Sequence, residues 1–411
     1  MQSTVETPMF LGRQPILDAA QSVIGYELLF HAPGQDEAVE ATTPAAATAQ
    51  TVVSSFSDLG IADALRHLKA FIPVDKEFLA ADTIQTLPPE QVVLAVAATL
   101  ADSALARCKE LVALGYPFCV DINPSALDTS GPMLDVARYI RIDIAAAAPD
   151  VVAEAVAKLH GHAHKLLATR VETEEQRTQC EELGFSFFQG YYFAKPLLDE
   201  EKQLDPTTQG LLRLINLVSS DVETHEIAEA FKIDPALTMS LLRVVNSAAM
   251  GLRSPVGSIT HAVSMLGRRQ LSRWLHLLLF RGGGGTLANN PLMLHAAMRG
   301  RMMEMLIERT TPGDRAALES AFMVGVMSLM PAALRMPMAK VLEQISLAPA
   351  VRAAVADYEG PLGQLLLLIE YYDDGNEVGC TLTMQRIGSI DQHMLNNCVV
   401  QTLLWVQGLE A

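Results

Sequence analysis

The segment from residue 167 to residue 196 constrains the fold of this chain more than any other. It joins a short apolar run to an amphipathic helical pattern and then to a second apolar run, in the order strand, helix, strand. Glu172 follows the first run, and Gln189 and Gly190 lie in the second, directly before two tyrosines. Functional side chains of α/β barrels lie at the carboxyl ends of the strands. The segment therefore predicts one unit of such a barrel, with an acid and an amide at that end.

The first half of the chain repeats this alternation of short apolar runs and longer helical patterns, which predicts a mainly parallel sheet closed into a (β/α) barrel. The helices expected between the strands include 102–114 and 173–183, and Gly184 ends the second of them. The predicted strands are Val23–Phe30, Phe71–Val74, Val92–Ala97, Phe118–Ile122, Tyr139–Ile144, His164–Thr169 and Ser186–Phe193.

The second half has a different character. Residues 199–208 are polar and contain a proline, which is typical of a linker, and strand-like alternation almost vanishes beyond them. Asp234 before Pro235 predicts a helix start, and Ser258 opens another helix that Gly267 should end. We therefore predict a multidomain α/β plus all-α protein, with a barrel over residues 1–204 and a helical domain over residues 205–411.

Composition excludes several classes of protein. Half of the 411 residues are hydrophobic and 19% are charged, so extensive disorder is excluded. The net charge of −17, which lies mostly in the first half, argues against nucleic-acid binding. One group of arginines in the second half is predicted to be a solvent-facing helical stripe rather than a nucleic-acid patch: Arg268, Arg269, Arg273 and Arg281.

The expected location is cytoplasmic, without a membrane span. The apolar runs, such as 274–280 and 365–369, are far shorter than the roughly 20 residues that cross a bilayer. The five cysteines are scattered without paired spacing, as in a reduced compartment, and the amino terminus has no secretory pattern.

Three stretches carry a resemblance to known families. QPILDAAQSVIGYELLFH and VETEEQ…GFSFFQGYYFAKP resemble the EAL domain, the cyclic di-GMP phosphodiesterase barrel. DPALTMSLLRVVNSAAMGLRSPVGSITHAVSMLG resembles the HDOD domain, a non-catalytic relative of metal phosphohydrolases. Together they resemble the EAL–HDOD two-domain signalling proteins called the YuxH family.

The resemblance implies where a metal site would lie. EAL enzymes hydrolyse a phosphodiester with divalent cations held by oxygen ligands at strand ends. Two expected carboxylate positions hold Ala95 and Ile122, which offer no ligand atom, and Arg141 replaces the expected lysine. The remaining positions are then vestiges of that site: Glu27, Asp75, Asp121, Arg141, Asp143, Glu172 and Gln189.

We therefore expect a barrel that is not a working enzyme and that needs no metal or other cofactor. The chain would be a signalling adaptor whose HDOD domain binds proteins, with a homodimer as a further expectation. Two alternatives stay open: a cyclic di-GMP phosphodiesterase that uses Mg²⁺ or Mn²⁺, and a receptor that binds cyclic di-GMP without cutting it.

Histidines give no second metal site in this interpretation. His160, His162 and His164 lie close together, but no nearby cysteine or carboxylate completes a ligand set. We expect a solvated turn there rather than a zinc site. The chain also contains no His-Asp dipeptide, the metal-binding pair of HD-type phosphohydrolases.

Overall fold

The computed structural model describes residues 10–31, 52–53, 56, 60–100, 102–159, 163–194, 204–232, 234–246, 256–281 and 290–407. Contacts divide the chain into two compact units. The first unit comprises Met1–Lys195, Leu287–Pro291 and Leu367–Ala411, and the second comprises Pro196–Thr286 and Leu292–Leu366. The boundary after residue 204 stays a prediction, and the contacts add the last helices of the chain to the barrel.

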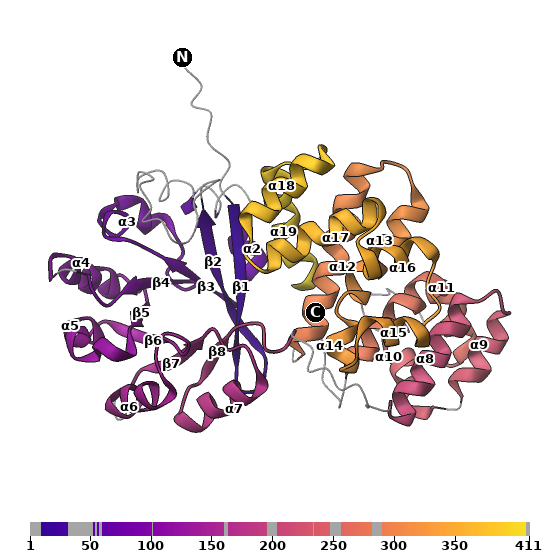
Figure 1. The fold of residues 1–411 in the computed structure, drawn as a ribbon, viewed down its shortest axis with the longest axis horizontal. Helices are drawn as coiled ribbons and strands as arrows, with labels where there is room; N and C mark the ends of the chain where they lie inside the picture. Colours follow the sequence, from indigo (N-terminus) through magenta and orange to yellow (C-terminus); the bar gives the residue numbers. More distant parts are fainter. Residues whose placement is uncertain are drawn as a thin grey trace, which may run out of the picture. The chain divides into compact units, whose positions relative to one another are not determined.

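The first unit contains a closed barrel, as predicted, with eight strands rather than the seven that were named from the sequence (Figure 1). Strand β1 is antiparallel to both of its neighbours, β2 and β8, and every other neighbouring pair is parallel. The strands are β1 (Phe10–Asp18), β2 (Val23–His31), β3 (Lys69–Pro73), β4 (Val92–Ala97), β5 (Phe118–Ile122), β6 (Ala137–Asp143), β7 (Lys165–Thr169) and β8 (Phe187–Gln189).

The helices of the barrel follow its parallel strands. In α7, Thr173 and Gln176 form a capping box and Gly184 is the left-handed C-cap, as the sequence predicts. The helical segments are α2 (Ile61–Leu65), α3 (Lys76–Ala80), η1 (Asp82–Thr86), α4 (Asp102–Ala113), η2 (Pro124–Ser130), α5 (Gly131–Leu134), α6 (Pro149–Leu159) and α7 (Glu174–Leu183).

Strand β1 was not predicted from the sequence. The C-terminal helices bond to the part of β1 that does not pair with β8. Strand β8 pairs only with residues 16–18 of β1. Nearer the start of β1, Leu11 donates its backbone N–H to Asn396 Oδ1 at 3.2 Å and accepts from the Tyr372 hydroxyl at 2.9 Å. These bonds satisfy backbone groups that would otherwise be buried without partners. The last helices of the chain therefore complete the barrel.

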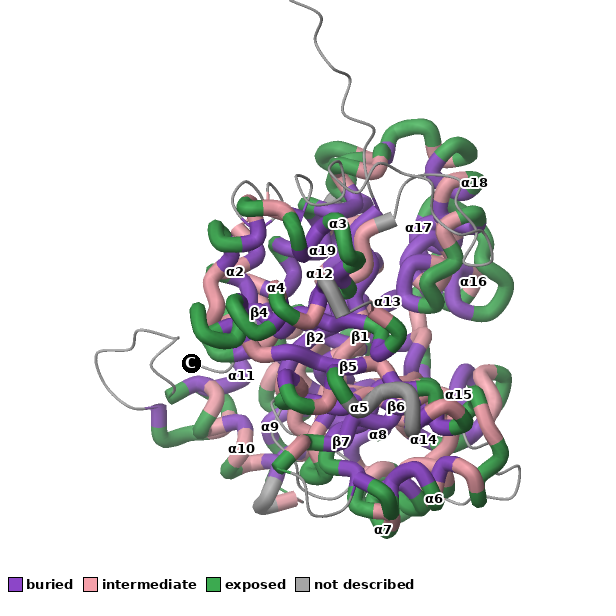
Figure 2. Tube along the Cα trace, turned by 90° about the vertical axis from the view of Figure 1, so that its left-hand side faces the viewer, coloured by how far each residue is buried: buried purple, intermediate pink, exposed green. Residues whose placement is uncertain are grey.

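Large side chains fill the barrel interior. One layer takes a residue from nearly every strand and includes Phe71, Tyr139 and Phe187, which pack with ring centroids 5.2 and 6.0 Å apart. Ala95 and Cys119 belong to the same layer. Figure 2 shows buried residues along strands β1, β2 and β5. Because this layer closes the barrel, a site can form only beyond it, toward the strand ends.

The described part of the second unit is helical, as predicted, and α17 continues from it into the first unit. Asp234 caps α10 by accepting from the Leu237 N–H at 3.0 Å. The helices are α8 (Pro206–Ser219), α9 (Thr224–Phe231), α10 (Pro235–Val245), α11 (Ile259–Leu278), η4 (Leu279–Arg281), α12 (Pro291–Thr310), α13 (Arg315–Met327), α14 (Met330–Leu334), α15 (Met338–Gln344), α16 (Pro349–Asp357) and α17 (Gly360–Asp373); α18 (Glu377–Ile387) and α19 (Gln392–Gln407) belong to the first unit. No helix among these described residues is long and apolar enough to cross a bilayer.

One helix end was predicted wrongly. Gly267 does not end its helix, because α11 runs on to Leu278 with a kink at that residue. The glycine has a φ of 69° and open space around its Cα, so it permits a change of direction without ending the hydrogen-bonded run.

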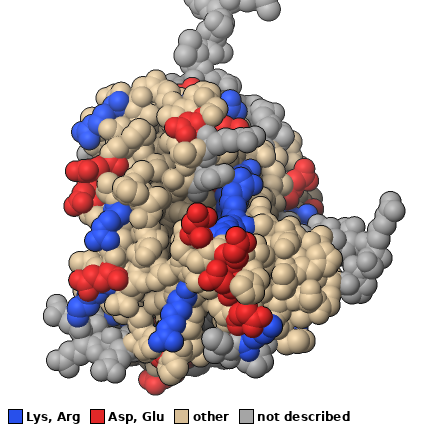
Figure 3. Space-filling view, turned by 90° about the vertical axis from the view of Figure 1, so that its right-hand side faces the viewer, with Lys and Arg blue, Asp and Glu red and all other residues tan. Residues whose placement is uncertain are grey.

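The arginine group of α11 and η4 is not a uniform solvent-facing stripe. Arg273 pairs with the buried Glu304 and lies 4.2 Å from the ring centroid of Phe322. Arg268 donates to the backbone carbonyl of Ser220. In the view of Figure 3, acidic and basic side chains are interspersed rather than gathered into one basic patch.

His276 should make the second unit sensitive to acid. It is 1% exposed, its Nδ1 contacts the backbone carbonyl of Ser272 at 2.7 Å, and burial lowers its pKa to about 4. The unfolded chain therefore binds a proton near pH 6.5 that the folded protein does not bind. Between pH 7 and pH 5 we expect a loss of about 2 kcal/mol in the free energy of unfolding. Urea unfolding in a Trp405→Phe background, followed by Trp274 of α11, measures it. His276→Leu should flatten this dependence, and an unchanged slope in that variant would contradict the assignment.

Candidate functional site

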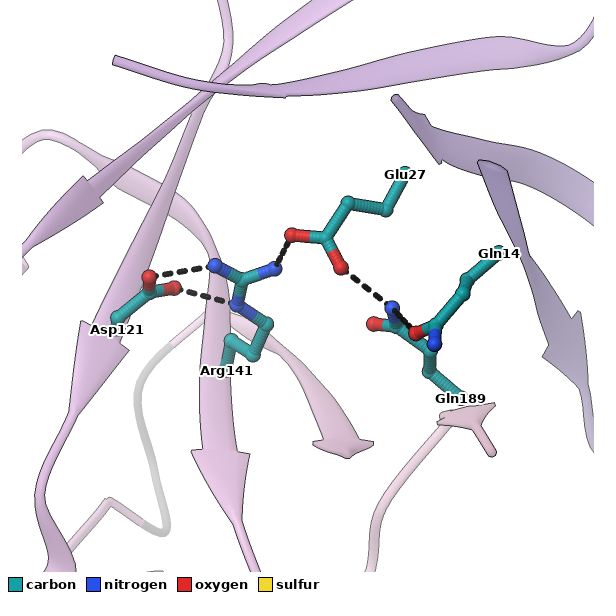
Figure 4. Close-up of polar contacts among 5 residues, drawn as sticks. All are labelled: Gln14, Glu27, Asp121, Arg141 and Gln189. Carbon is teal, nitrogen blue, oxygen red and sulfur yellow. Dashed lines mark hydrogen bonds and ion pairs between the residues drawn. The ribbon is translucent and has the colours of Figure 1, made fainter. Parts of the chain in front are cut away.

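Four polar side chains meet inside the barrel, beyond the apolar layer (Figure 4). Glu27 comes from β2, Asp121 from β5, Arg141 from β6 and Gln189 from the end of β8. Side chains alternate along a strand, so Asp121 shares the inward face with Cys119, and Arg141 shares it with Tyr139. The barrel thus brings together residues that are up to 162 positions apart in the sequence.

Arg141 is the centre of this cluster. Its Nε and Nη2 donate to the two carboxylate oxygens of Asp121 at 2.6 and 2.5 Å, in a bidentate fork. Its Nη1 donates to Glu27 Oε1. The side chains of Arg141 and Glu27 are 13% and 9% exposed, whereas that of Asp121 is 37% exposed. One guanidinium therefore bridges two carboxylates from different strands, a geometry that lysine cannot provide.

The carboxylates fix the charge of this arginine. Burial acts against a charged guanidinium, but the negative charges of Glu27 and Asp121 outweigh it. The pKa of Arg141 is consequently held well above its ordinary value, so the side chain is cationic at neutral pH.

Gln189 orients the other side of Glu27. Its Nε2 donates to Glu27 Oε2 at 2.5 Å and to Gln14 Oε1 at 2.8 Å. Gln189 is 3% exposed, and its own Oε1 is buried without a hydrogen-bond partner among the described residues. A buried oxygen acceptor without a hydrogen bond costs free energy of folding unless a ligand, ion or water binds to it. The cluster therefore offers one unused oxygen acceptor.

Three of the predicted site residues lie outside this cluster. Asp75 is exposed and caps α3 by accepting from the Phe78 N–H at 2.7 Å. Asp143 accepts from Arg170 Nε at 2.7 Å and from the Ala145 N–H at 2.9 Å. Glu172 is exposed and precedes α7. These positions therefore surround the mouth of the barrel rather than share the arginine.

The two positions without ligand atoms differ from each other. Ala95 is 2% exposed and belongs to the inward layer, so the barrel does lack a carboxylate there. Ile122 pairs with Ile142 on β6, and alternation places it on the opposite face from Asp121. Its apolar side chain is buried on the outer face of the barrel wall, 3% exposed. Position 122 is therefore not on the strand face that carries the cluster.

A pair of divalent cations does not fit the cluster as it stands. Both oxygens of Asp121 and both of Glu27 accept hydrogen bonds from Arg141 or Gln189. Hard cations need several free oxygen ligands. Within the described ranges, no group of three or more His, Cys, Asp or Glu residues could hold a metal ion.

The histidine stretch is only partly described by the structure. His160 and His162 lie outside the described residues, while His164 Nδ1 contacts the Ala137 carbonyl at 2.9 Å.

Gln14, next to the cluster, was not predicted as a site residue from the sequence. It lies opposite Glu27 in the register of β1 and β2. The signal was its place in the first of the three resembling stretches, but β1 itself had not been predicted.

Comparisons with known proteins agree with this architecture. The family model described as the HDOD domain matches residues 204–332. Cyclic di-GMP phosphodiesterase CdgJ of Vibrio cholerae is 28% identical over 407 residues, which cover 97% of this chain and 93% of CdgJ. YuxH of Bacillus subtilis is 23% identical over 412 residues and 98% of each chain. A solved structure, a standalone EAL protein from Vibrio cholerae O395 bound to c-di-GMP, is 17% identical with a TM-score of 0.39, and covers 47% of this chain and 93% of its own.

These comparisons correct the expectation that the chain is not an enzyme. That prediction is wrong, because a relative that matches the chain almost from end to end is a cyclic di-GMP phosphodiesterase. The prediction rested on Ala95 and Ile122, and the register of β5 places Ile122 on the opposite face from Asp121. Three findings agree on the architecture: the barrel with its antiparallel first strand, the HDOD match, and the two relatives that match almost end to end. The chain is a two-domain protein of the EAL–HDOD type.

Proposed function

We propose that this protein is a cyclic di-GMP phosphodiesterase whose reaction takes place at the Glu27–Asp121–Arg141 cluster of the barrel. The observation that carries the proposal is the match to CdgJ over 97% of this chain and 93% of the relative. The cluster supports it, because Arg141 uses three of its five N–H groups on the carboxylates and can donate the other two to a phosphodiester oxygen.

The residues of the cluster have separate roles in this reaction. Arg141 binds a non-bridging phosphoryl oxygen and stabilises the negative charge that grows on it. Glu27, which Gln189 orients, accepts a proton from the attacking water. The water oxygen bonds to phosphorus, one P–O ester bond breaks, and the departing sugar oxygen takes a proton from solvent. The product is the linear dinucleotide with a terminal phosphomonoester.

The test is turnover by the full-length protein. Purified protein is incubated with cyclic di-GMP, with and without Mn²⁺, and the products are separated by liquid chromatography. We expect linear dinucleotide from the unmodified protein and a loss of at least about 100-fold in Glu27→Gln. Glu229→Gln, an exposed change in α9, is the matched control and should keep full activity. Production of linear dinucleotide at the same rate by Glu27→Gln would contradict the assignment to this cluster.

The proposal also covers the location of the protein, the partners of the HDOD domain and the oligomeric state. We place the reaction in the cytoplasm, where the HDOD domain binds signalling proteins and the protein forms a homodimer. Size-exclusion chromatography with light scattering checks the homodimer.

A further inference from the structure

We infer that Arg141 is a built-in cation that competes with a divalent metal ion for Glu27 and Asp121. The inference rests on the proposed function, because it concerns the charge that the phosphodiesterase site supplies to its substrate. Two carboxylates on separate strands face each other only across this guanidinium. Without the positive charge their repulsion would open the cluster or draw in another cation.

The donor atoms suit a hard cation once the arginine is removed. Loss of the guanidinium frees both oxygens of Asp121 and one oxygen of Glu27. Gln189 adds a third ligand residue through its amide Oε1, which is buried and has no partner among the described residues. Two carboxylates and one amide oxygen, completed by water, are ligands that Mn²⁺ or Mg²⁺ accepts.

A built-in cation also accounts for how a site with Ala95 in its inner layer keeps a positive group beside its carboxylates. EAL enzymes are expected to hold cations with carboxylates at strand ends, and one such position has no ligand atom here. A guanidinium needs fewer carboxylate partners than a metal pair, and it is held by the chain itself. The charge at the site should therefore depend little on the concentration of free divalent cations.

The experiment measures Mn²⁺ binding to the full-length protein by electron paramagnetic resonance, without nucleotide. Arg141→Met should bind Mn²⁺ at least tenfold more tightly than the unmodified protein. Asp121→Asn in the Arg141→Met background should reverse most of that gain. Equal Mn²⁺ affinity in Arg141→Met and the unmodified protein would overturn the inference.

A second variant keeps the test decisive if Arg141→Met misfolds. Circular dichroism and thermal unfolding would reveal such misfolding. Arg141→Lys keeps a positive charge but loses the bidentate fork, so Mn²⁺ should bind severalfold more tightly than to the unmodified protein; unchanged affinity overturns the inference. The turnover assay separates this inference from the proposed function. If the variants bind Mn²⁺ more tightly but the unmodified protein does not hydrolyse cyclic di-GMP, only the proposed phosphodiesterase function is refuted. If the unmodified protein hydrolyses cyclic di-GMP but the variants do not bind Mn²⁺ more tightly, only the competition between Arg141 and the metal ion is refuted.

Discussion

Glu27→Leu is expected to lower the free energy of unfolding of the barrel by about 3 kcal/mol. The change leaves Arg141, whose side chain is only 13% exposed, with one carboxylate partner instead of two. It also removes one of the two acceptors of Gln189 Nε2, the other being Gln14 Oε1. Urea unfolding in a Trp274→Phe background measures the loss, since Trp405 of α19 then reports on the barrel unit alone.

The matched control is a double-mutant cycle with Arg141→Met. Each single change takes one member out of the Glu27–Arg141 pair and leaves the other member buried, whereas the double change removes both members of that pair. The double variant should therefore be more stable than the sum of the two losses predicts, by about 2 kcal/mol. Strict additivity would contradict the view that the arginine and the glutamate stabilise each other.

Gly190→Ala is expected to destabilise the barrel by more than about 3 kcal/mol, because the new methyl group has no space. A Cβ at Gly190 would lie 1.9 Å from the Val171 carbonyl oxygen and 2.7 Å from its carbonyl carbon, and these are backbone atoms that cannot rotate away. The glycine also has a φ of 151°. Its neighbour Gln189 orients Glu27, so hydrolysis should fall together with stability. Unfolding followed by Trp405 and the turnover assay measure the two effects.

Gly115→Ala separates the clash from the backbone strain. Gly115 also has a positive φ, 97°, but a methyl group added there would meet Pro89 Cβ at 3.8 Å, an ordinary contact distance. This control should cost only about 1 kcal/mol, the usual penalty for alanine in that conformation. Similar losses in the two variants would show that the contact with Val171 is not the cause.

The sequence predicted those parts of the fold that depend on local pattern. Strands β4 and β5 have the bounds that their apolar runs indicate, and α7 ends at its glycine. Strand β1 escaped prediction because Arg13, Gln14 and Pro15 interrupt its alternation, and it is held by pairing to β2 and by the C-terminal helices. Non-local contacts of that kind leave no periodic signal in the chain.

The site was predicted less completely than the fold. The residues of the cluster were named from their resemblance to a family, but which of them meet depends on closure of the barrel. Ile122 was judged by its chemistry alone, whereas strand register decides that it faces outward. The position of Asp75 was predictable, since an aspartate directly before a short helical run is a common N-cap. The bridging role of Arg141 required the three-dimensional positions of Glu27 and Asp121.

Hydrolysis at the barrel cluster is tested most directly by phosphorus NMR of cyclic di-GMP mixed with an excess of the full-length protein. If the barrel cluster hydrolyses cyclic di-GMP, the phosphodiester resonance declines and a phosphomonoester resonance appears. At completion the monoester and the remaining diester have equal intensity, because one of the two phosphates has been cut. Glu27→Gln shows no such change over the same time. A phosphodiester spectrum that stays unchanged with the unmodified protein, in the presence and in the absence of Mn²⁺, would contradict it.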